Sequence, residues 1–153
     1  MRSCKPILLV DDDDDVRELV TMVLEVEGYV VESAESGFVA LDRLRSLEPS
    51  VILLDMNMPG MNGWEFAHSY RAQAGPYAPV VVFTGGHVGS DVVQQIDADA
   101  FVTKPFDLND LLAVVGRYAA RTDGGALAAT ISALGHMDSA AKVTPAARAL
   151  ASR

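Results

Sequence analysis

Five short apolar runs follow one another along the first 120 residues of the chain, each bounded by polar or turn-forming residues. The runs are continuous and do not alternate apolar with polar positions. A short continuous run of this kind is typical of a strand that is buried on both faces. The runs that predict strands are Ile7–Val10, Tyr29–Val31, Val51–Leu54, Val80–Phe83 and Phe101–Thr103.

The segments between these runs repeat their apolar residues at helical spacing. After the first run, four residues fall at i, i+3, i+4 and i+7 and predict one face of a helix that Gly28 ends. Asp107 is the predicted N-cap of the last helix, with Asp110 three residues further on. The residues that mark the predicted helices are Val16, Leu19, Val20 and Val23; Ala40, Leu41, Leu44 and Leu47, before Pro49; Phe66, Ala67 and Tyr70, within 63–72; a weak segment at Asp91–Ile96; and Leu108, Leu111, Leu112 and Val115.

Strand followed by helix, repeated five times, predicts an α/β fold. Buried strands joined through helices form a parallel sheet with helices on both faces. In such a doubly wound sheet, ligands bind beyond the carboxyl ends of the strands. The residues that come directly after each predicted strand are therefore the candidate functional residues.

The composition changes after about residue 120. Residues 121–153 are rich in Ala and Gly and hold four basic and two acidic residues, which gives them a net charge of +2. Because the whole chain carries −9, residues 1–120 carry −11. We expect residues 1–120 to form one domain. We expect residues 121–153 to be a C-terminal tail that is flexible or forms short helices, because it is too short for a second domain.

Size and composition restrict the class of protein. A chain of 153 residues with half of them hydrophobic can bury a core without disulfides, and Cys4 is its only cysteine. The acidic balance disfavours direct binding to nucleic acid, which requires a basic surface. No apolar run approaches the length of about 20 residues that a membrane span needs, and no secretory signal is evident. We expect a cytoplasmic protein that does not bind a membrane.

Polar residues follow four of the predicted strands. Asp11 and Asp12 follow the first strand, Asp55 the third, Thr84 the fourth and Lys104 the fifth. Three carboxylates that share one sheet edge resist joint ionisation and favour a bound cation. An all-oxygen site suits Mg²⁺. Together with a hydroxyl and an ammonium group, such a site is equipped for phosphoryl transfer to an aspartate.

Four segments closely resemble the receiver domain of two-component response regulators. The resemblance covers residues 5 to about 118, in order and with near-family spacing. It implies a flavodoxin-like (βα)5 fold with strand order 2-1-3-4-5. The segments are Ile7-Leu8-Leu9-Val10-Asp11-Asp12, the stretch from Leu53-Leu54-Asp55-Met56-Asn57 to Gly63, Phe83-Thr84-Gly85 and Thr103-Lys104-Pro105-Phe106.

The resemblance implies a role for each matching residue. Asp55 would be the phosphoacceptor, Asp12 a direct Mg²⁺ ligand, Asp11 a ligand through water, and Asn57 a ligand through its backbone carbonyl. Thr84 and Lys104 would hold the phosphoryl oxygens, with Gly85 leaving room for them. Phe101 would be the aromatic switch, although a strand aromatic is usually core. The Lys104-Pro105 peptide would be cis. Asp13, Asp14 and Asp15 are read as helix-start residues.

The predicted function is that of a stand-alone receiver that signals to a protein partner and is not a turnover enzyme. A sensor histidine kinase or a phosphotransfer protein would phosphorylate it, and a downstream protein effector would bind the phosphorylated form. The sequence leaves open whether the chain forms a homodimer. One alternative is a Mg²⁺-dependent phosphatase of the haloacid dehalogenase type, although Asn57 stands where that family has its second acid. Another is a receiver fold that binds partners without phosphorylation.

One spacing departs from the family. Thr84 and Lys104 are 20 residues apart, about two fewer than we expect. We expect the shortening to affect the fourth helix, on the surface that receivers usually use for dimerisation or output.

Overall fold

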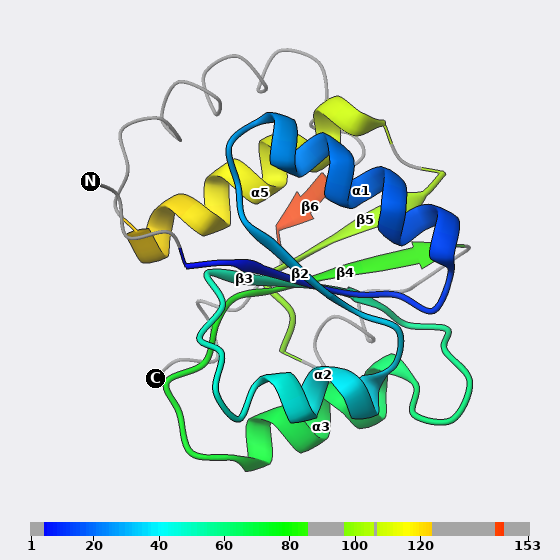
Figure 1. Cartoon of the computed structure of the whole chain (residues 1–153), viewed down its shortest axis with the longest axis vertical. Helices are drawn as coiled ribbons and strands as arrows, with labels where there is room; N and C mark the ends of the chain where they lie inside the picture. The colour runs from blue at the N-terminus through cyan, green and yellow to red at the C-terminus, as the bar shows by residue number, and fades with distance from the viewer. Residues whose placement is uncertain (1–4, 86–96, 106, 124–142, 146–153) are drawn as a thin grey trace.

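A parallel sheet with helices on both faces forms the body of the protein (Figure 1). The computed structural model describes residues 5–85, 97–105, 107–123 and 143–145. The strands are β1 (Ile7–Val10), β2 (Val31–Ala34), β3 (Val51–Asp55), β4 (Val80–Gly85), β5 (Ala100–Lys104) and β6 (Val143–Pro145). The helices are α1 (Asp14–Val26), α2 (Gly37–Arg43), α3 (Gly63–Ala72) and α5 (Leu108–Asp123).

The strand order confirms the predicted architecture. The sheet runs β2-β1-β3-β4-β5-β6, and its first five members are parallel in the predicted order 2-1-3-4-5. The sixth strand is antiparallel and was not predicted. It lies within the segment predicted as a flexible or helical tail, most of which is outside the described residues. The predicted helix at Asp91–Ile96 is also outside them.

Two apolar cores lie on the two faces of the sheet, because successive side chains of a strand point to opposite faces. From β1, Leu8 and Val10 enter the core beneath α2 and α3, whereas Ile7 and Leu9 enter the core beneath α1 and α5. Figure 1 shows these two pairs of helices on opposite sides of the sheet. All four side chains are fully buried.

The helix ends follow the predicted capping signals. Asp13 is the N-cap of α1, and its side chain accepts hydrogen bonds from the backbone N–H groups of Asp15 and Val16. Gly28 follows α1 with φ +95°, a backbone conformation that favours glycine. At α5, the Asp107 side chain accepts a hydrogen bond from Asn109 N at 2.7 Å.

Three details of the sequence prediction were wrong. The second strand lies at Val31–Ala34 and not at Tyr29–Val31. Three of the four residues of this edge strand are only partly buried, and Glu32 and Ser33 interrupt its apolar pattern. Leu19 is 45% exposed, and the buried positions of α1 are Val20 and Leu24. Helix α2 ends at Arg43, although the side chains of Leu44 and Leu47 still pack on the core.

Among the described residues, none of the helices combines the length and the apolar character that crossing a membrane requires.

Two glycines occupy the same position, directly after the N-cap, in α2 and α3, but their surroundings differ. A Cβ added to Gly63 would lie 2.8 Å from Met56 Cα and 3.0 Å from the backbone oxygen of Asp55. At Gly37 the three atoms nearest to the added Cβ all belong to the Met61 side chain, with Sδ at 2.7 Å. Backbone cannot move aside as a flexible side chain can, so Gly63 fixes how closely α3 approaches the end of β3.

We predict that Gly63→Ala lowers the free energy of unfolding by about 1–3 kcal/mol, as overpacking usually does. The matched control is Gly37→Ala, which we expect to lower it by a smaller amount because Met61 can adopt another rotamer. Urea denaturation of the two variants and the wild type measures both changes. Equal losses for the two variants would contradict the argument from backbone contact.

Candidate functional site

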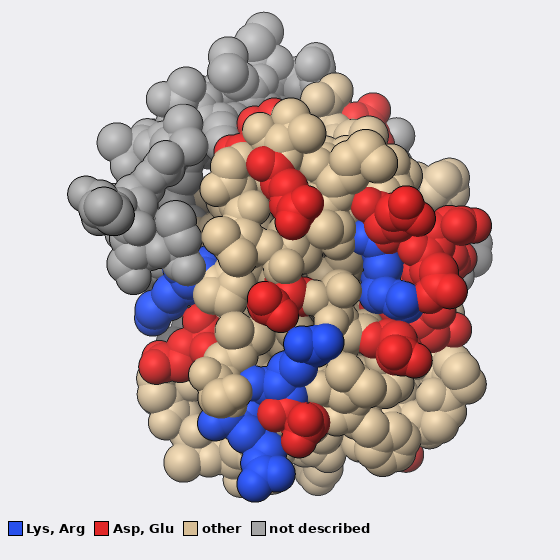
Figure 2. Space-filling view, in the orientation of Figure 1, with Lys and Arg blue, Asp and Glu red and all other residues tan. Residues whose placement is uncertain are grey.

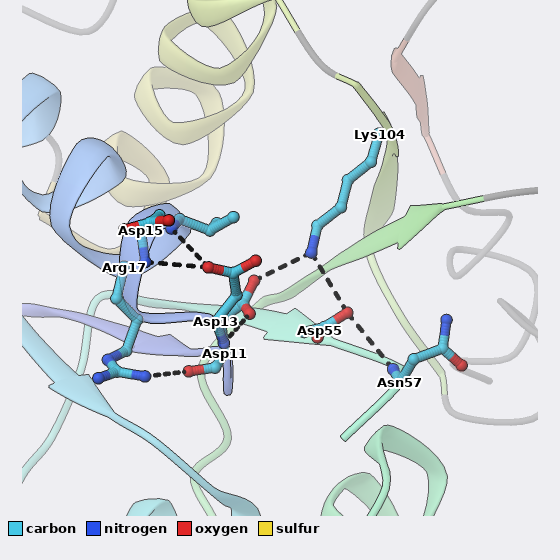
Figure 3. Close-up of polar contacts among 8 residues, drawn as sticks. Asp11, Asp13, Asp15, Arg17, Asp55, Asn57 and Lys104 are labelled. Carbon is cyan, nitrogen blue, oxygen red and sulfur yellow. Dashed lines mark hydrogen bonds and ion pairs between the residues drawn. The ribbon is translucent and has the colours of Figure 1, made fainter. Parts of the chain in front are cut away.

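The end of β1 places two carboxylates side by side in different environments. Asp11 directly follows β1 and is fully buried, whereas Asp12 is exposed. Asp11 Oδ1 accepts a hydrogen bond from Asp13 N at 2.9 Å, and its backbone oxygen accepts one from Arg17 Nη1 at 2.8 Å (Figure 3). These bonds fix the turn from β1 into α1 and hold the Asp11 carboxylate toward the site.

Asp55 is the last residue of β3 and is 4% exposed. Its Oδ1 accepts a hydrogen bond from the backbone N–H of Asn57 at 3.3 Å. Since β1 and β3 are neighbours and Leu54 lies opposite Val10, the residues that follow each strand face the same end of the sheet. The register therefore brings Asp55 next to Asp11.

Lys104 reaches both buried carboxylates from the end of β5. Its Nζ lies 3.1 Å from Asp11 Oδ2 and 3.5 Å from Asp55 Oδ1. Figure 3 shows the ammonium group between the two carboxylates, with Asp55 between Lys104 and the backbone of Asn57. Lys104 and Asp11, which are 93 positions apart in the sequence, are thus in direct hydrogen-bonding contact.

The electrostatics of the site disfavour a second negative charge. Burial and the neighbouring Asp11 carboxylate raise the pKa of Asp55 to about 6, although Lys104 and the Asn57 N–H act in the opposite direction. Burial alone would lower the pKa of Lys104, but its contacts with Asp11 and Asp55 outweigh burial and raise it. Lys104 is therefore a permanent cation that partly neutralises the carboxylates.

The three carboxylates fit a hard divalent cation. One oxygen from each of Asp11, Asp12 and Asp55 lies within 4.8 Å of the others. Three carboxylates facing one ammonium leave excess negative charge, and Mg²⁺ prefers oxygen ligands while keeping several of its waters. Asn57 contributes its N–H to Asp55, whereas the ligand role predicted for its carbonyl stays a prediction.

The other predicted site residues are placed less completely. In the β4–β5 register, the backbone of Thr84 lies opposite Thr103 and that of Gly85 opposite Lys104, so both flank the ammonium-bearing end of β5. Phe101 is half-buried and packs on the core beneath α2 and α3. Its predicted role as a switch stays a prediction. The Lys104-Pro105 peptide is cis, as predicted.

The last three residues of the acidic run lie at the start of α1, as predicted. Asp13 caps α1, and Asp14 and Asp15 lie exposed in its first turn. Figure 2 shows Asp and Glu side chains gathered over the end of the molecule where α1 begins. Arg17 was not among the predicted site residues. It pairs with Asp14 and donates a hydrogen bond to the backbone oxygen of Asp11. The available signal was a single cation two residues after a run of five acids.

Comparison with known proteins gives one consistent result. Residues 7–116 match a family described as the response regulator receiver domain. The chain is 38% identical over 119 residues to the DNA-binding response regulator MtrA of Mycobacterium tuberculosis strain H37Rv, an alignment that covers 76% of this chain and 51% of MtrA. It is 38% identical over 134 residues to the response regulator MprA of Mycobacterium avium, covering 84% of this chain and 58% of MprA. The chain spans about half the length of these relatives.

Solved structures show the same fold. The chemotaxis response regulator CheY4 of Vibrio cholerae superimposes with a TM-score of 0.69 at 31% identity, covering 76% of this chain and 99% of CheY4. The receiver domain of NtrX from Brucella abortus superimposes with a TM-score of 0.67, also at 31% identity, covering 74% of this chain and 97% of the solved receiver-domain chain.

The raised pKa of Asp55 predicts a pH-dependent effect of Asp55→Asn on stability in EDTA. Burial disfavours the ionised carboxylate, so folding of the wild type weakens as pH rises from about 4 through about 6. Asparagine has no such charge. We therefore expect the urea midpoint of Asp55→Asn to exceed that of the wild type at pH 7.5, and the difference to shrink as pH falls below about 6.

The matched control for this prediction is Asp42→Asn, which neutralises a carboxylate that is 79% exposed. Its difference from the wild type should remain small and vary little over the same pH range, because exposed ion pairs contribute little. A pH-independent difference for Asp55→Asn would show that the buried charge does not affect stability.

Proposed function

The chain belongs to the response regulator receiver domain family, and we propose that it accepts a phosphoryl group on Asp55 and transmits the change to a protein partner. The observation that supports this function is the placement of Lys104 Nζ against both Asp55 and Asp11. A carboxylate nucleophile, an acidic cluster for a metal and a fixed cation meet at one end of the sheet. This arrangement suits phosphoryl transfer, where positioning and charge stabilisation supply most of the catalysis.

In the proposed reaction, a carboxylate oxygen of Asp55 attacks phosphorus, the new O–P bond forms, and the bond between phosphorus and the donor breaks with its electron pair leaving on the donor. Asp55 must be ionised to attack. Asp11 and Asp12 would hold Mg²⁺, which neutralises charge on the transferred group when it is bound. The Asn57 N–H and the Lys104 ammonium orient the Asp55 carboxylate before the reaction.

The proposed switch follows from the contacts of Lys104. Phosphorylation adds about −1.5 to −2 charge and strong acceptor oxygens at Asp55. The Lys104 ammonium would then move from Asp11 toward the phosphoryl oxygens, with the Thr84 hydroxyl as second donor. Because Lys104 ends β5, this movement would alter the surface around that strand. We propose the half-buried Phe101 of β5 as a residue that responds.

The proposed partners are those of the receiver family. A sensor histidine kinase or a phosphotransfer protein would donate the phosphoryl group, and a protein effector would read the result in the cytoplasm. DNA binding is named for MtrA as a whole. We do not propose it for residues 1–120 of this chain, whose net charge of −11 opposes contact with phosphates. The stand-alone function and a homodimer stay predictions.

We predict that Asp12→Asn weakens Mg²⁺ binding at least about tenfold, since even residues behind metal ligands often affect affinity 10–100-fold. Isothermal titration calorimetry with MgCl₂ measures the change. The matched control is Asp15→Asn, which removes the same charge from the same acidic run in an exposed first turn. Equal weakening by both variants would indicate general attraction to acidic residues and not a defined site.

We predict that acetyl phosphate with Mg²⁺ adds one phosphoryl group to the wild type and to Asp15→Asn, but none to Asp55→Asn. Intact-mass spectrometry counts the groups, and borohydride reduction of the acyl phosphate identifies the modified residue. EDTA should abolish the modification. Labelling of Asp55→Asn would overturn the assignment of Asp55.

The same preparations test the two alternatives. Steady turnover of a generic phosphomonoester would favour the haloacid dehalogenase type of phosphatase over a signalling phosphoacceptor. A wild type that binds Mg²⁺ yet is not modified by small phosphodonors or by a histidine kinase would favour a receiver fold that signals by binding alone.

A further inference from the structure

The two edges of the parallel sheet differ in polarity. The edge strand β2 carries Glu32, which forms an ion pair with Arg43 at 3.4 Å, and then Ser33. At the other edge, β5 presents Ala100, Phe101 and Val102, and its first charge is Lys104 at its end. An uncharged edge with free backbone groups readily pairs with another strand. Of the two edge strands, β5 is therefore the one whose outer backbone groups are expected to pair with another strand.

The strand that pairs with β5 is a segment of the C-terminal region. Strand β6 pairs antiparallel with β5, with Phe101 opposite Thr144 and Val102 opposite Val143 (Figure 1). This strand is additional to the five parallel strands of the sheet.

The hydrogen bonds of β3 and β4 determine which β5 amide faces the edge. Met56 N donates to Phe83 O at 3.3 Å, so the backbone groups of Phe83 face β3. Adjacent residues of a strand point their backbone groups to opposite sides, and those of Val82 therefore face β5. In a parallel pair, a residue bonds to the two neighbours of its partner.

The partner of Val82 is Phe101, so Val82 bonds to the residues on either side of Phe101 and leaves the Phe101 amide facing away from β4. The Phe101 N–H and C=O therefore point toward β6. Proline provides an independent check on this assignment. Pro145 has no N–H and fits only where the backbone faces away from β5, which makes Thr144 the residue whose N–H faces Phe101.

Length and charge favour the same chain as the source of this strand. The 19 residues between α5 and β6 span up to about 60 Å when extended, more than the distance across a small domain. Residues 142–153 carry Lys142, Arg148 and Arg153 and no acidic residue, whereas residues 1–120 carry −11. A tethered cationic segment beside an acidic body has a high effective concentration.

We propose that the edge of β5 is a strand-binding surface and that Val143–Pro145 of the same chain is its occupant. The ligand class is an extended segment that supplies one N–H and one C=O to Phe101 and tolerates proline at the next position. This surface lies on the strand whose end carries Lys104, three residues beyond Phe101. The inference goes beyond phosphorylation of Asp55 and does not depend on it.

Amide hydrogen exchange of the full chain, followed by NMR, tests the proposal with two proline substitutions. Thr144→Pro removes the N–H that faces Phe101, and we expect Phe101 to exchange at least about tenfold faster. The matched control is Val143→Pro, which removes an N–H that faces away from β5, like that of Pro145. In this variant Phe101 should stay protected. Val102, which faces β4, should exchange at the same rate in all three proteins.

Three results would overturn the proposal. Phe101 could exchange equally fast in the wild type and in Thr144→Pro, or the two proline variants could behave alike. Protection that rises with protein concentration would assign the strand to a second copy. As a direct test of binding, a peptide of residues 140–148 at millimolar concentration should restore protection of Phe101 in Thr144→Pro. Failure to restore it would show that the edge does not bind a free strand.

Discussion

The contact of Lys104 with Asp11 and Asp55 is the interaction on which the carboxyl end of the sheet depends. A buried carboxylate is costly unless a partner compensates its charge, and here two of them share one ammonium group. Compensation is incomplete, as the raised pKa of Asp55 shows. The same deficit of positive charge disfavours folding and suits the divalent cation and the phosphoryl contact that we propose for this site.

Strand β5 joins this site to the rest of the surface. Its last residue supplies the ammonium group, its middle residues pack on both cores, and its outer edge pairs with β6. A change in the position of Lys104 therefore acts on a strand that has one neighbour from the body of the domain and one from the C-terminal region. In the function that we propose, β5 would therefore connect modification of Asp55 to the surface that a partner recognises.

The parts of the fold that the sequence predicted well are those with a strong local signal. The bounds of β1 are identical to the prediction, because four apolar residues between a proline and a run of acids permit little else. Strand β2 was misplaced because its edge position leaves it half-buried and polar. Leu19 was assigned to the core because i+3 and i+4 spacing alone does not decide which side of a short apolar stripe contacts the sheet.

The sequence by itself determined the fold class and the group of residues at the strand ends, because buried parallel strands and their polar ends leave a clear pattern. The strand order was predicted only through the resemblance to the receiver domain. Only the tertiary structure decided that Lys104 contacts both Asp11 and Asp55, that Arg17 holds the Asp11 backbone, and that Asp55 has a raised pKa. It alone revealed β6, since three residues of an Ala-rich tail become a strand through the edge they meet. Distances, burial and edge pairing depend on contacts between segments far apart in the chain, and local sequence patterns do not predict such contacts.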